Sequence, residues 1–330
     1  MEINIIGGSG FIGSRLCHIL KKSKTQFNIF DKNESQEFSS NHRQVDVREI
    51  ESLRENLLEG NPIINLAAEH RDDVSPKSLY HDVNVDGANN ICKVASEKNI
   101  TTIVFTSTVA VYGFAPIGTD ESGKINPFNE YGKSKFEAEK VFKEWQKKDS
   151  MTRTLVIIRP TVVFGERNRG NVYNLFKQIF SKKFLMVGSG ENAKSMAYVE
   201  NVASFIKYSL DFNPGVHIYN YIDKPDFTMN ELVSNINKTL GRSEKIKYRL
   251  PYQSIFLISK VIDLVALFTN KKFNISSIRI NKFCQNTVFN SSIEETGFKA
   301  PVDLEDGFKK TIYYEFLEDN KNEVTYYGES

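Results

Sequence analysis

The sequence contains few cysteines and no excess of charge of either sign. Its three cysteines, Cys17, Cys92 and Cys284, lie far apart without CxxC spacing, so neither a disulfide framework nor a zinc site is expected. The five histidines also show no metal-ligand spacing, and we expect no bound metal. The 43 basic and 41 acidic residues leave a net charge of +2, which gives no electrostatic reason to expect a nucleic acid as a partner.

Long apolar runs are also missing from the 330 residues. The most apolar segment, residues 255–268, is interrupted by Lys260 and Asp263 and is shorter than the ~20 residues that a membrane-spanning helix needs. The N-terminal residues MEINIIGGSG enter a predicted strand directly, without the charged start and cleavage site of a signal peptide. We therefore predict no transmembrane helix and a location in the reducing cytoplasm.

The first 160 residues alternate short apolar runs with helical patterns. Continuous rather than alternating apolar runs are typical of parallel strands that are covered on both faces. This rhythm predicts an α/β fold with a Rossmann-type doubly wound parallel sheet, to which a smaller mixed α/β lobe is attached. The predicted strands are INII (3–6), FNIF (27–30), PIINLAA (62–68), TIVFTS (102–107) and LVIIRP (155–160).

The glycine-rich segment GGSGFIG follows the first predicted strand and opens a helix. In this context Gly7, Gly10 and Gly13 allow backbone amides to approach a pyrophosphate at the positive end of the helix. The spacing G-x-x-G-x-x-G differs by one residue from the usual Rossmann fingerprint, but the same physical reasoning applies. The segment predicts a dinucleotide site with contacts from these glycines and from Phe11 and Ile12.

Acidic residues after two strands bear on the identity of the dinucleotide. Asp31 lies 24 residues after Gly7, where its carboxylate can accept hydrogen bonds from the adenosine ribose and repel a 2′-phosphate. NAD is thus favoured over NADP, although the adjacent Lys32 is a cation that tolerates a phosphate. Asp46 and Val47, after the presumed third strand, are candidates for holding the adenine edge.

A Tyr-x-x-x-Lys pattern supplies candidates for the catalytic chemistry. On a helix, Tyr131 and Lys135 lie on one face, so the Lys135 ammonium can favour the ionised phenol and make Tyr131 a general base. Ser107 and Thr108 end the fourth core strand, and either hydroxyl can hydrogen-bond the reacting hydroxyl group. An isolated Tyr/Lys pair is common on helices, so this prediction depends on the order in which the motifs follow one another.

Together these motifs resemble those of the extended short-chain dehydrogenases in the sugar epimerase/dehydratase family. The likeness extends from GGSGFIG to LEDGFKKTI (304–312) and includes STVAVYG (107–113), YGKSK (131–135) and RPTVVFG (159–165). The resemblance implies a catalytic role for Thr108 together with Tyr131 and Lys135, which also contact NAD. The other NAD contacts that it implies are Leu66, Ala67, Ala68 and Asn84.

The motifs and the apolar pattern also predict how the chain divides. We expect the NAD-binding Rossmann domain in residues 1–164, with a return segment at about 195–222. Residues 165–194 and 223–318 are expected to form the substrate-binding lobe, and residues 319–330 a polar, frayed tail.

A closer resemblance is carried by AAEHRDDVSP (67–76), GERNRGNVYNL (165–175) and GENAKSMAYVENV (190–202). These segments are similar to those of bacterial enzymes that epimerise C4 of N-acetylglucosamine attached through diphosphate to undecaprenol. That resemblance implies a 4-epimerase that recycles its NAD through a transient 4-keto sugar. Its product, N-acetylgalactosamine, would supply a surface polysaccharide, the O-antigen of lipopolysaccharide.

Two departures from the UDP-galactose 4-epimerases support a carrier other than UDP. Val162 stands where those enzymes have an asparagine, and Lys194 stands where they have an arginine. Both family positions touch the nucleotide diphosphate, so losing them puts ordinary UDP-sugar binding in doubt.

Charged residues near the expected sugar site are candidates for substrate recognition. Arg167 and Arg169 stand on a glycine-bounded loop, where two guanidinium groups can hold a diphosphate; the alternative is that both form surface salt bridges. The EHRDD segment (69–73) follows the strand beside the expected nicotinamide, where it can contact the sugar. The alternative is that this segment is a charged, solvated loop. The other candidate substrate contacts are Glu69, His70, Arg71, Asn171 and Lys194.

Residues 255–268 predict a helix with a wide apolar arc, yet Phe256 and Leu267 fall on the same side as Lys260 and Asp263. Apolar residues on the polar side, with cations nearby, suggest peripheral contact with the cytoplasmic face of the inner membrane. The alternative is an ordinary helix of the lobe. The nearby cations are Lys245, Lys247, Arg249, Lys271 and Lys272.

Several functions remain open at this point. The expected substrate is a polyprenyl-diphosphate-linked sugar; the alternatives are a UDP-N-acetylglucosamine or UDP-glucose 4-epimerase and an NAD(P)-dependent reductase or dehydrogenase of sugar nucleotides. A 4,6-dehydratase is disfavoured because Val109, not an acidic residue, follows Thr108. A noncatalytic NAD-sensing protein is disfavoured because Tyr131 and Lys135 are intact. A homodimer is one candidate assembly.

Overall fold

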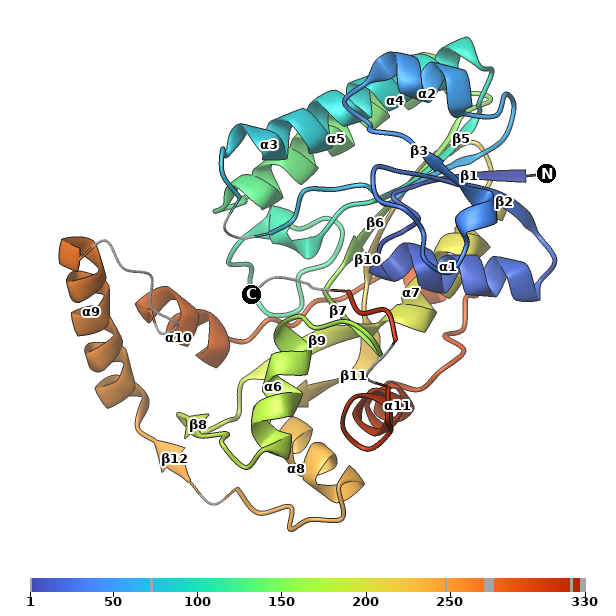
Figure 1. The fold of residues 1–330 in the computed structure, drawn as a ribbon. Helices are drawn as coiled ribbons and strands as arrows, with labels where there is room; N and C mark the ends of the chain where they lie inside the picture. The colour runs from blue at the N-terminus through green and yellow to red at the C-terminus, as the bar shows by residue number, and fades with distance from the viewer. Residues whose placement is uncertain (1, 72–73, 247, 270–275, 321–322, 327–330) are drawn as a thin grey trace.

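The computed structural model describes residues 2–71, 74–246, 248–269, 276–320 and 323–326, and gives only the backbone of residues 266–268 and 279. It consists of a large α/β part and a smaller lobe below it in the view of Figure 1. All three cysteines are free thiols, as the spacing predicted.

A seven-stranded, all-parallel sheet forms the centre of the large part, in the order β3-β2-β1-β4-β5-β6-β10. This arrangement confirms the predicted Rossmann-type sheet. Ile6, at the end of β1, lies opposite Phe30 in β2 and Asn65 in β4, so these strands end at one edge, where the glycine-rich segment begins. The strands are β1 (Glu2–Ile6), β2 (Gln26–Asp31), β3 (His42–Gln44), β4 (Ile63–Asn65), β5 (Thr102–Thr106), β6 (Thr154–Pro160) and β10 (Gly215–Tyr221).

Helices cover both faces of this sheet (Figure 1). On one face, α1 (Phe11–Lys22) and α7 (Val199–Tyr208) bury Leu16 and Phe205 against the strands. On the other, α2 (Ile50–Asn56), α4 (Gly87–Glu97) and α5 (Glu130–Lys147) bury Leu53, Ile91 and Trp145. The short helical segments are α3 (Ser78–His81), η1 (Ser39–Asn41), η2 (Asp82–Asp86), η3 (Val109–Tyr112), η4 (Ser209–Asp211) and η5 (Ile293–Thr296).

The smaller lobe is built on a three-stranded sheet in the order β11-β9-β7. In its core, Phe164 of β7 packs against Phe176 of α6 and Phe308 of α11, which also contact each other. The lobe strands are β7 (Val162–Phe164), β8 (Met186–Val187), β9 (Ala193–Tyr198), β11 (Asp223–Thr228) and β12 (Arg249–Leu250). Its helices are α6 (Asn171–Phe180), α8 (Met229–Thr239), α9 (Tyr252–Thr269), α10 (Ser277–Cys284) and α11 (Leu304–Phe316).

The chain crosses between the two parts more often than the expected boundaries suggest. The return segment at about 195–222 is divided: β9 lies in the lobe sheet, whereas α7 and β10 belong to the large part. Within the tail, residues 323–326 return to the loop at 165–170, where Tyr326 forms a β-bridge with Asn168. No described helix is long and apolar enough to cross a membrane.

Candidate active site

A cleft of about 720 Å³ runs along the carboxyl ends of the main-sheet strands. It is lined at one end by Asp31 and Asp46 and at the other by Thr108, Tyr131 and Lys135. The structure therefore brings together motifs that are more than a hundred residues apart in the chain, such as Gly7 and Lys135. The cleft also contains the predicted residues Gly7, Gly10, Phe11, Ile12, Gly13, Val47, Leu66, Ala67 and Ala68.

The glycine-rich segment fits a pyrophosphate for two reasons. A Cβ on Gly7, whose φ is +76°, would lie 2.4 Å from the Ala67 amide nitrogen, and one on Gly13 would lie 2.5 Å from the Gly8 carbonyl oxygen. The turn is therefore too tight for side chains. Gly10 occupies the N-cap of α1 and has no side chain to bond the first helical amides, which are left for an anion.

The adenosine end of the cleft carries the two predicted carboxylates. Asp31 accepts hydrogen bonds from the amides of Ser9 (3.0 Å) and Asn33 (2.9 Å). Burial raises the pKa of Asp31, and these bonds oppose the rise. Asp46 forms an ion pair with Arg48 (2.5 Å), and hydrogen bonding by that guanidinium lowers the pKa of Asp46. Both carboxylates line the end of the cleft at which contacts with the ribose and the adenine are expected.

At the other end, close packing sets the position of Tyr131. Asn129 caps α5 by accepting a hydrogen bond from the Gly132 amide at 2.9 Å. A Cβ on Gly132 would lie 2.6 Å from the Ala110 carbonyl oxygen, so only glycine lets the start of α5 approach η3 this closely. The Thr108 side chain accepts a hydrogen bond from the Ala110 amide at 3.1 Å. Tyr131 and Thr108 are thereby held beside each other.

The electrostatics of the pair differ from the sequence-based expectation. Burial raises the pKa of Tyr131 to about 12, and a hydrogen bond with Thr108 opposes this rise. Burial lowers the pKa of Lys135 to about 7, and the negative charge of Glu139 opposes that fall. The expected lowering of the Tyr131 pKa by Lys135 is not seen: burial of the phenol sets the direction of the change, and Lys135 is not among its causes. An oxidised nicotinamide ring, when bound, would add positive charge near this pair and favour the ionised phenol.

A family model described as the NAD dependent epimerase/dehydratase family matches residues 3–221. The chain belongs to this family. NAD is its cofactor, in agreement with Asp31 and the glycine-rich turn.

Two relatives of this chain are named for sugars on different carriers, undecaprenyl diphosphate in one and UDP in the other. The Escherichia coli O157:H7 N-acetyl-alpha-D-glucosaminyl-diphospho-ditrans,octacis-undecaprenol 4-epimerase is 45% identical over 332 residues, which cover 99% of each chain. The Vibrio cholerae UDP-glucose 4-epimerase is 29% identical over 248 residues, 72% of this chain and 70% of that one.

Solved structures of other family members share the fold. UDP-N-acetylglucosamine 4-epimerase from Bacillus cereus superposes with a TM-score of 0.74 at 19% identity, covering 94% of this chain and 98% of its own. UDP-glucuronic acid 4-epimerase from the same organism, in complex with NAD, gives a TM-score of 0.72 at 19% identity and covers 95% and 98%.

A buried network beneath the catalytic end of this epimerase fold was missed by sequence reasoning. Glu139, fully buried, accepts hydrogen bonds from the Ser107 hydroxyl (2.6 Å) and from Arg159 (2.8 and 2.6 Å). Arg159 also donates to the Tyr112 hydroxyl at 2.6 Å. Ser107 and Thr108 both line the cleft, and Ser107 is in addition fixed by its bond to Glu139, a bond that no described contact gives Thr108. Glu139 lies one turn after Lys135, a spacing that could have signalled it.

Asn84 holds two elements together beside the cleft but is not among the described residues that line it. Its amide oxygen accepts the Glu69 amide (2.9 Å), and its amide nitrogen donates to the Glu69 carbonyl (3.0 Å) and the Ser134 hydroxyl (2.9 Å). It thus fixes the 69–71 loop to α5, and the NAD contact of Asn84 that the resemblance implies stays a prediction.

The predicted substrate residues near this loop have different surroundings. His70 lines the cleft. Glu69 is buried and accepts a hydrogen bond from Arg71 at 3.1 Å, which lowers the pKa of the Glu69 carboxyl against the effect of burial. Asn171, at the start of α6, lines the cleft beside Val162.

The two loop arginines do not face the cleft as a diphosphate clamp. Arg167 forms ion pairs with Glu37 (2.7 Å) and Glu323 (2.5 Å). Arg169 pairs with Glu315 (3.1 Å). Neither is among the cleft-lining residues within the described ranges, and carboxylates distant in the sequence neutralise both guanidinium groups.

Lys194 is also occupied by the protein itself. Its ammonium donates to the carbonyl oxygens of Lys282 (2.9 Å) and Gln285 (2.5 Å) at the end of α10. Burial lowers the pKa of Lys194 to about 8. The side chain therefore caps α10, and the structure gives it no direct contact with the cleft.

Proposed function

We propose that this chain is an NAD-dependent 4-epimerase acting on N-acetylglucosamine linked through diphosphate to undecaprenol. The observation that carries the proposal is the 45% identity, along 99% of both chains, to the Escherichia coli enzyme named for this reaction. The position of Thr108, Tyr131 and Lys135 at one end of a dinucleotide cleft supports the chemistry.

In the proposed mechanism the chain's residues move a proton and orient the sugar. The Tyr131 oxygen takes the proton of the sugar's C4 hydroxyl group and later returns it, while Thr108 orients that oxygen. Lys135 holds the nicotinamide ribose. NAD, when bound, would supply the hydride chemistry at C4, and rotation of the transient 4-keto sugar between the two transfers would invert that centre. The reaction is therefore redox-neutral.

The proposal for the carrier rests on the likeness to the lipid-linked-sugar epimerase, and two departures from the UDP-galactose 4-epimerases agree with it. Val162 is 43% exposed and lines the cleft where the UDP-galactose 4-epimerases have an asparagine. Lys194, at the second departure, is held on α10. Among the described lining residues, neither position offers a side-chain donor to a nucleotide diphosphate. A UDP-sugar 4-epimerase remains the alternative, supported by the weaker likeness to the Vibrio cholerae enzyme.

We expect the purified protein to convert lipid-linked N-acetylglucosamine to its C4 epimer without added NAD and without net NADH. UDP-N-acetylglucosamine should be converted at least ~10-fold less well, a difference that corresponds to roughly 1.4 kcal/mol, because the chain resembles most fully an enzyme named for the lipid-linked sugar. The two sugars are incubated separately, the products are separated by chromatography, and absorbance reports NADH.

Two outcomes would overturn this proposal in different ways. Efficient conversion of the UDP-sugar alone would place the chain with the nucleotide-sugar epimerases. Stoichiometric NADH would instead indicate a dehydrogenase.

If the lipid-linked sugar is the substrate, its N-acetylgalactosamine product supplies O-antigen synthesis at the cytoplasmic face of the inner membrane.

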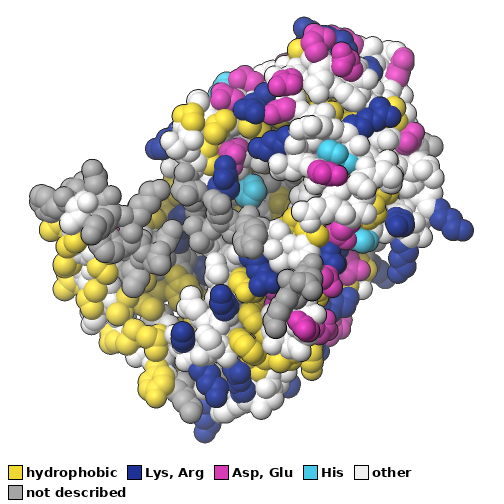
Figure 2. Space-filling model, in the orientation of Figure 1, with side chains coloured by type: hydrophobic (Ala, Val, Ile, Leu, Met, Phe, Trp, Pro, Cys, Tyr) yellow, Lys and Arg dark blue, Asp and Glu magenta, His cyan; other side chains and the backbone are white. Residues whose placement is uncertain are grey.

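The lipid carrier makes a peripheral membrane contact part of the proposal. On α9, five aliphatic side chains occupy one arc and are exposed: Leu257, Ile258, Val261, Leu264 and Val265. Figure 2 shows hydrophobic side chains gathered over α9 at the lower left edge of the molecule.

This arc differs from the side on which the sequence placed Phe256 and Leu267. Phe256 is half-buried and stacks on Tyr252, with 5.5 Å between ring centres, and the Leu267 side chain lies outside the described residues. Asp263 accepts a hydrogen bond from the Ser277 amide at 3.0 Å, so the polar side of α9 packs on α10. The wide apolar arc therefore faces away from the lobe.

The charges around the arc favour an anionic bilayer. Lys245, Arg249 and Lys260 are exposed, and no acidic side chain among the described residues of α9 is exposed. Lys247, Lys271 and Lys272 lie outside the described residues.

The association of two copies of this chain into a homodimer stays a prediction.

We expect the wild-type protein to float with vesicles of phosphatidylethanolamine and phosphatidylglycerol. Val261→Ser with Leu264→Ser should lower the bound fraction by about tenfold, because each loses roughly 1 kcal/mol or more of apolar burial. The matched control is Ile117→Ser with Met151→Ser, which removes two side chains exposed by 66% and 84% outside α9. Equal flotation of both double variants would refute this contact.

A further inference from the structure

Residues 323–326 return from the end of α11 to the loop at 165–170. The Arg169 amide donates to the Tyr326 carbonyl at 2.7 Å, and the Tyr326 amide donates to the Arg167 carbonyl at 2.6 Å. These two bonds and the bridge between Asn168 and Tyr326 add a short strand to the loop. The segment that composition predicted to be frayed is thus hydrogen-bonded at Tyr326.

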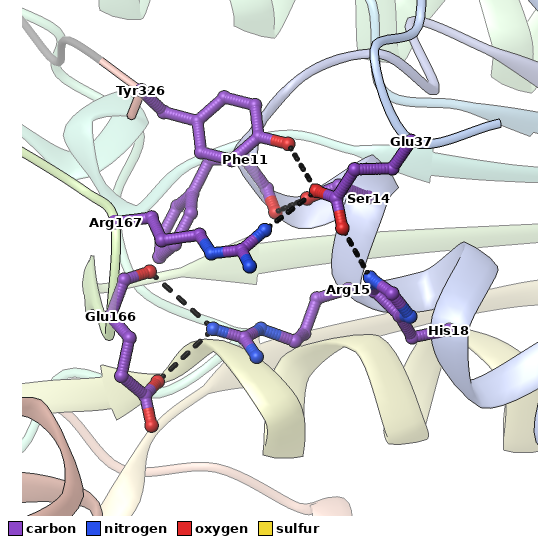
Figure 3. Close-up of a pocket in the computed structure, with 8 residues that line it drawn as sticks. All are labelled: Phe11, Ser14, Arg15, His18, Glu37, Glu166, Arg167 and Tyr326. Carbon is purple, nitrogen blue, oxygen red and sulfur yellow. Dashed lines mark hydrogen bonds and ion pairs between the residues drawn. The ribbon is translucent and has the colours of Figure 1, made fainter. Parts of the chain in front are cut away.

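Arg167 connects the same segment to a third element, the chain after β2. Its guanidinium group bonds Glu323 (2.5 Å) from the tail and Glu37 (2.7 Å) from the loop that follows Asp31. The Tyr326 hydroxyl also lies 3.3 Å from Glu37. Figure 3 shows Arg167 and Tyr326 approaching Glu37 from the same side.

The Tyr326 ring reaches the start of α1, where the pyrophosphate site lies. Its centre is 6.0 Å from that of Phe11, and Figure 3 shows the two rings next to each other. Tyr326 lines both the dinucleotide cleft and a smaller cavity of about 200 Å³ behind it. Thr325 lines the cleft as well. The ring therefore forms part of the wall between the two spaces.

We propose that residues 323–326 are a strap that retains NAD, with Tyr326 as its positioning residue. The strap ties together three borders of the cleft: the start of α1, the loop after β2 and the loop at 165–170. Separating any two of these borders to release the dinucleotide breaks contacts of Tyr326 or Arg167.

The chemical use of such a strap rests on the proposed epimerisation. A cofactor that is reduced in the first half of the reaction must stay bound until the second half, since its loss would leave a keto sugar. Retention by the strap is independent of the sugar's carrier, and it is measured without any sugar.

The test compares NAD retention in variants of the full-length protein. Tyr326→Ala should release NAD at least about tenfold faster, a change that corresponds to roughly 1.4 kcal/mol. Tyr326→Phe keeps the ring against Phe11 and should retain most of the wild-type behaviour. Tyr313→Ala, which removes a tyrosine 49% exposed on α11, is the matched control and should change nothing.

Bound NAD per chain after gel filtration and its dissociation rate into excess unlabelled NAD are the readouts, with thermal melting of each variant as the check on folding. The variant Arg167→Ala distinguishes the strap from the diphosphate clamp that the sequence predicted. If Arg167 belongs to the strap, this variant retains less NAD; if Arg167 belongs to a clamp for the substrate, its NAD content is unchanged. Wild-type NAD dissociation both in Tyr326→Ala and in a chain ending at Asn320 overturns the proposal, whatever the sugar specificity proves to be.

Discussion

Tyr131→Phe is expected to lose at least ~100-fold in turnover while still binding NAD, the low end of the effect of removing a general acid–base group. The phenylalanine ring keeps the packing at the start of α5, but the oxygen that exchanges the C4 proton is gone. The loss should appear in kcat and kcat/KM together, because the interaction belongs to the transition state.

Tyr80→Phe is the control for this variant, since Tyr80 is a buried neighbour whose hydroxyl donates to the Arg71 carbonyl. Its turnover should stay close to that of the wild type. Near-normal turnover in Tyr131→Phe would remove this phenol from the mechanism, and lost NAD binding would show that the substitution disturbs the cleft.

The second large effect is expected from the buried pair of Glu139 and Arg159. Their side chains are 0% and 3% exposed, and 2.6 Å separates the closest charged atoms. Glu139→Gln removes the charge but keeps the size, which leaves the Arg159 guanidinium buried without its counter-ion. Breaking such a pair costs about 3–5 kcal/mol, so the midpoint of thermal unfolding should fall by on the order of 10 °C.

Glu137→Gln provides the matched control on the same helix, because Glu137 is exposed. It should melt within about 1–2 °C of the wild type, as expected for an exposed carboxylate. Equal melting temperatures for the two variants would show that the pair contributes nothing to stability. Glu139→Leu combined with Arg159→Met should recover much of the loss, since no buried charge is left.

The polar residues show where sequence reasoning stops. Asp31, Tyr131 and Lys135 line the cleft, and each follows a strand end or lies on a helical turn that the local pattern predicts. Arg167 was assigned to a diphosphate, yet its ion-pair partners Glu37 and Glu323 are 130 and 156 residues away. A charge pattern in the sequence indicates that a cation is present, but not which anion neutralises it.

By itself the sequence determined the parallel sheet, the glycine-rich turn and the Tyr131–Lys135 spacing. These features depend on periodicity and on steric limits within a few residues. Only the tertiary structure decided that Glu139 supports Ser107, that α9 turns its apolar arc away from the lobe and that Tyr326 meets the cofactor cleft. Those outcomes depend on contacts between residues far apart in the chain, whose energies are set by burial and by the partners that folding brings together.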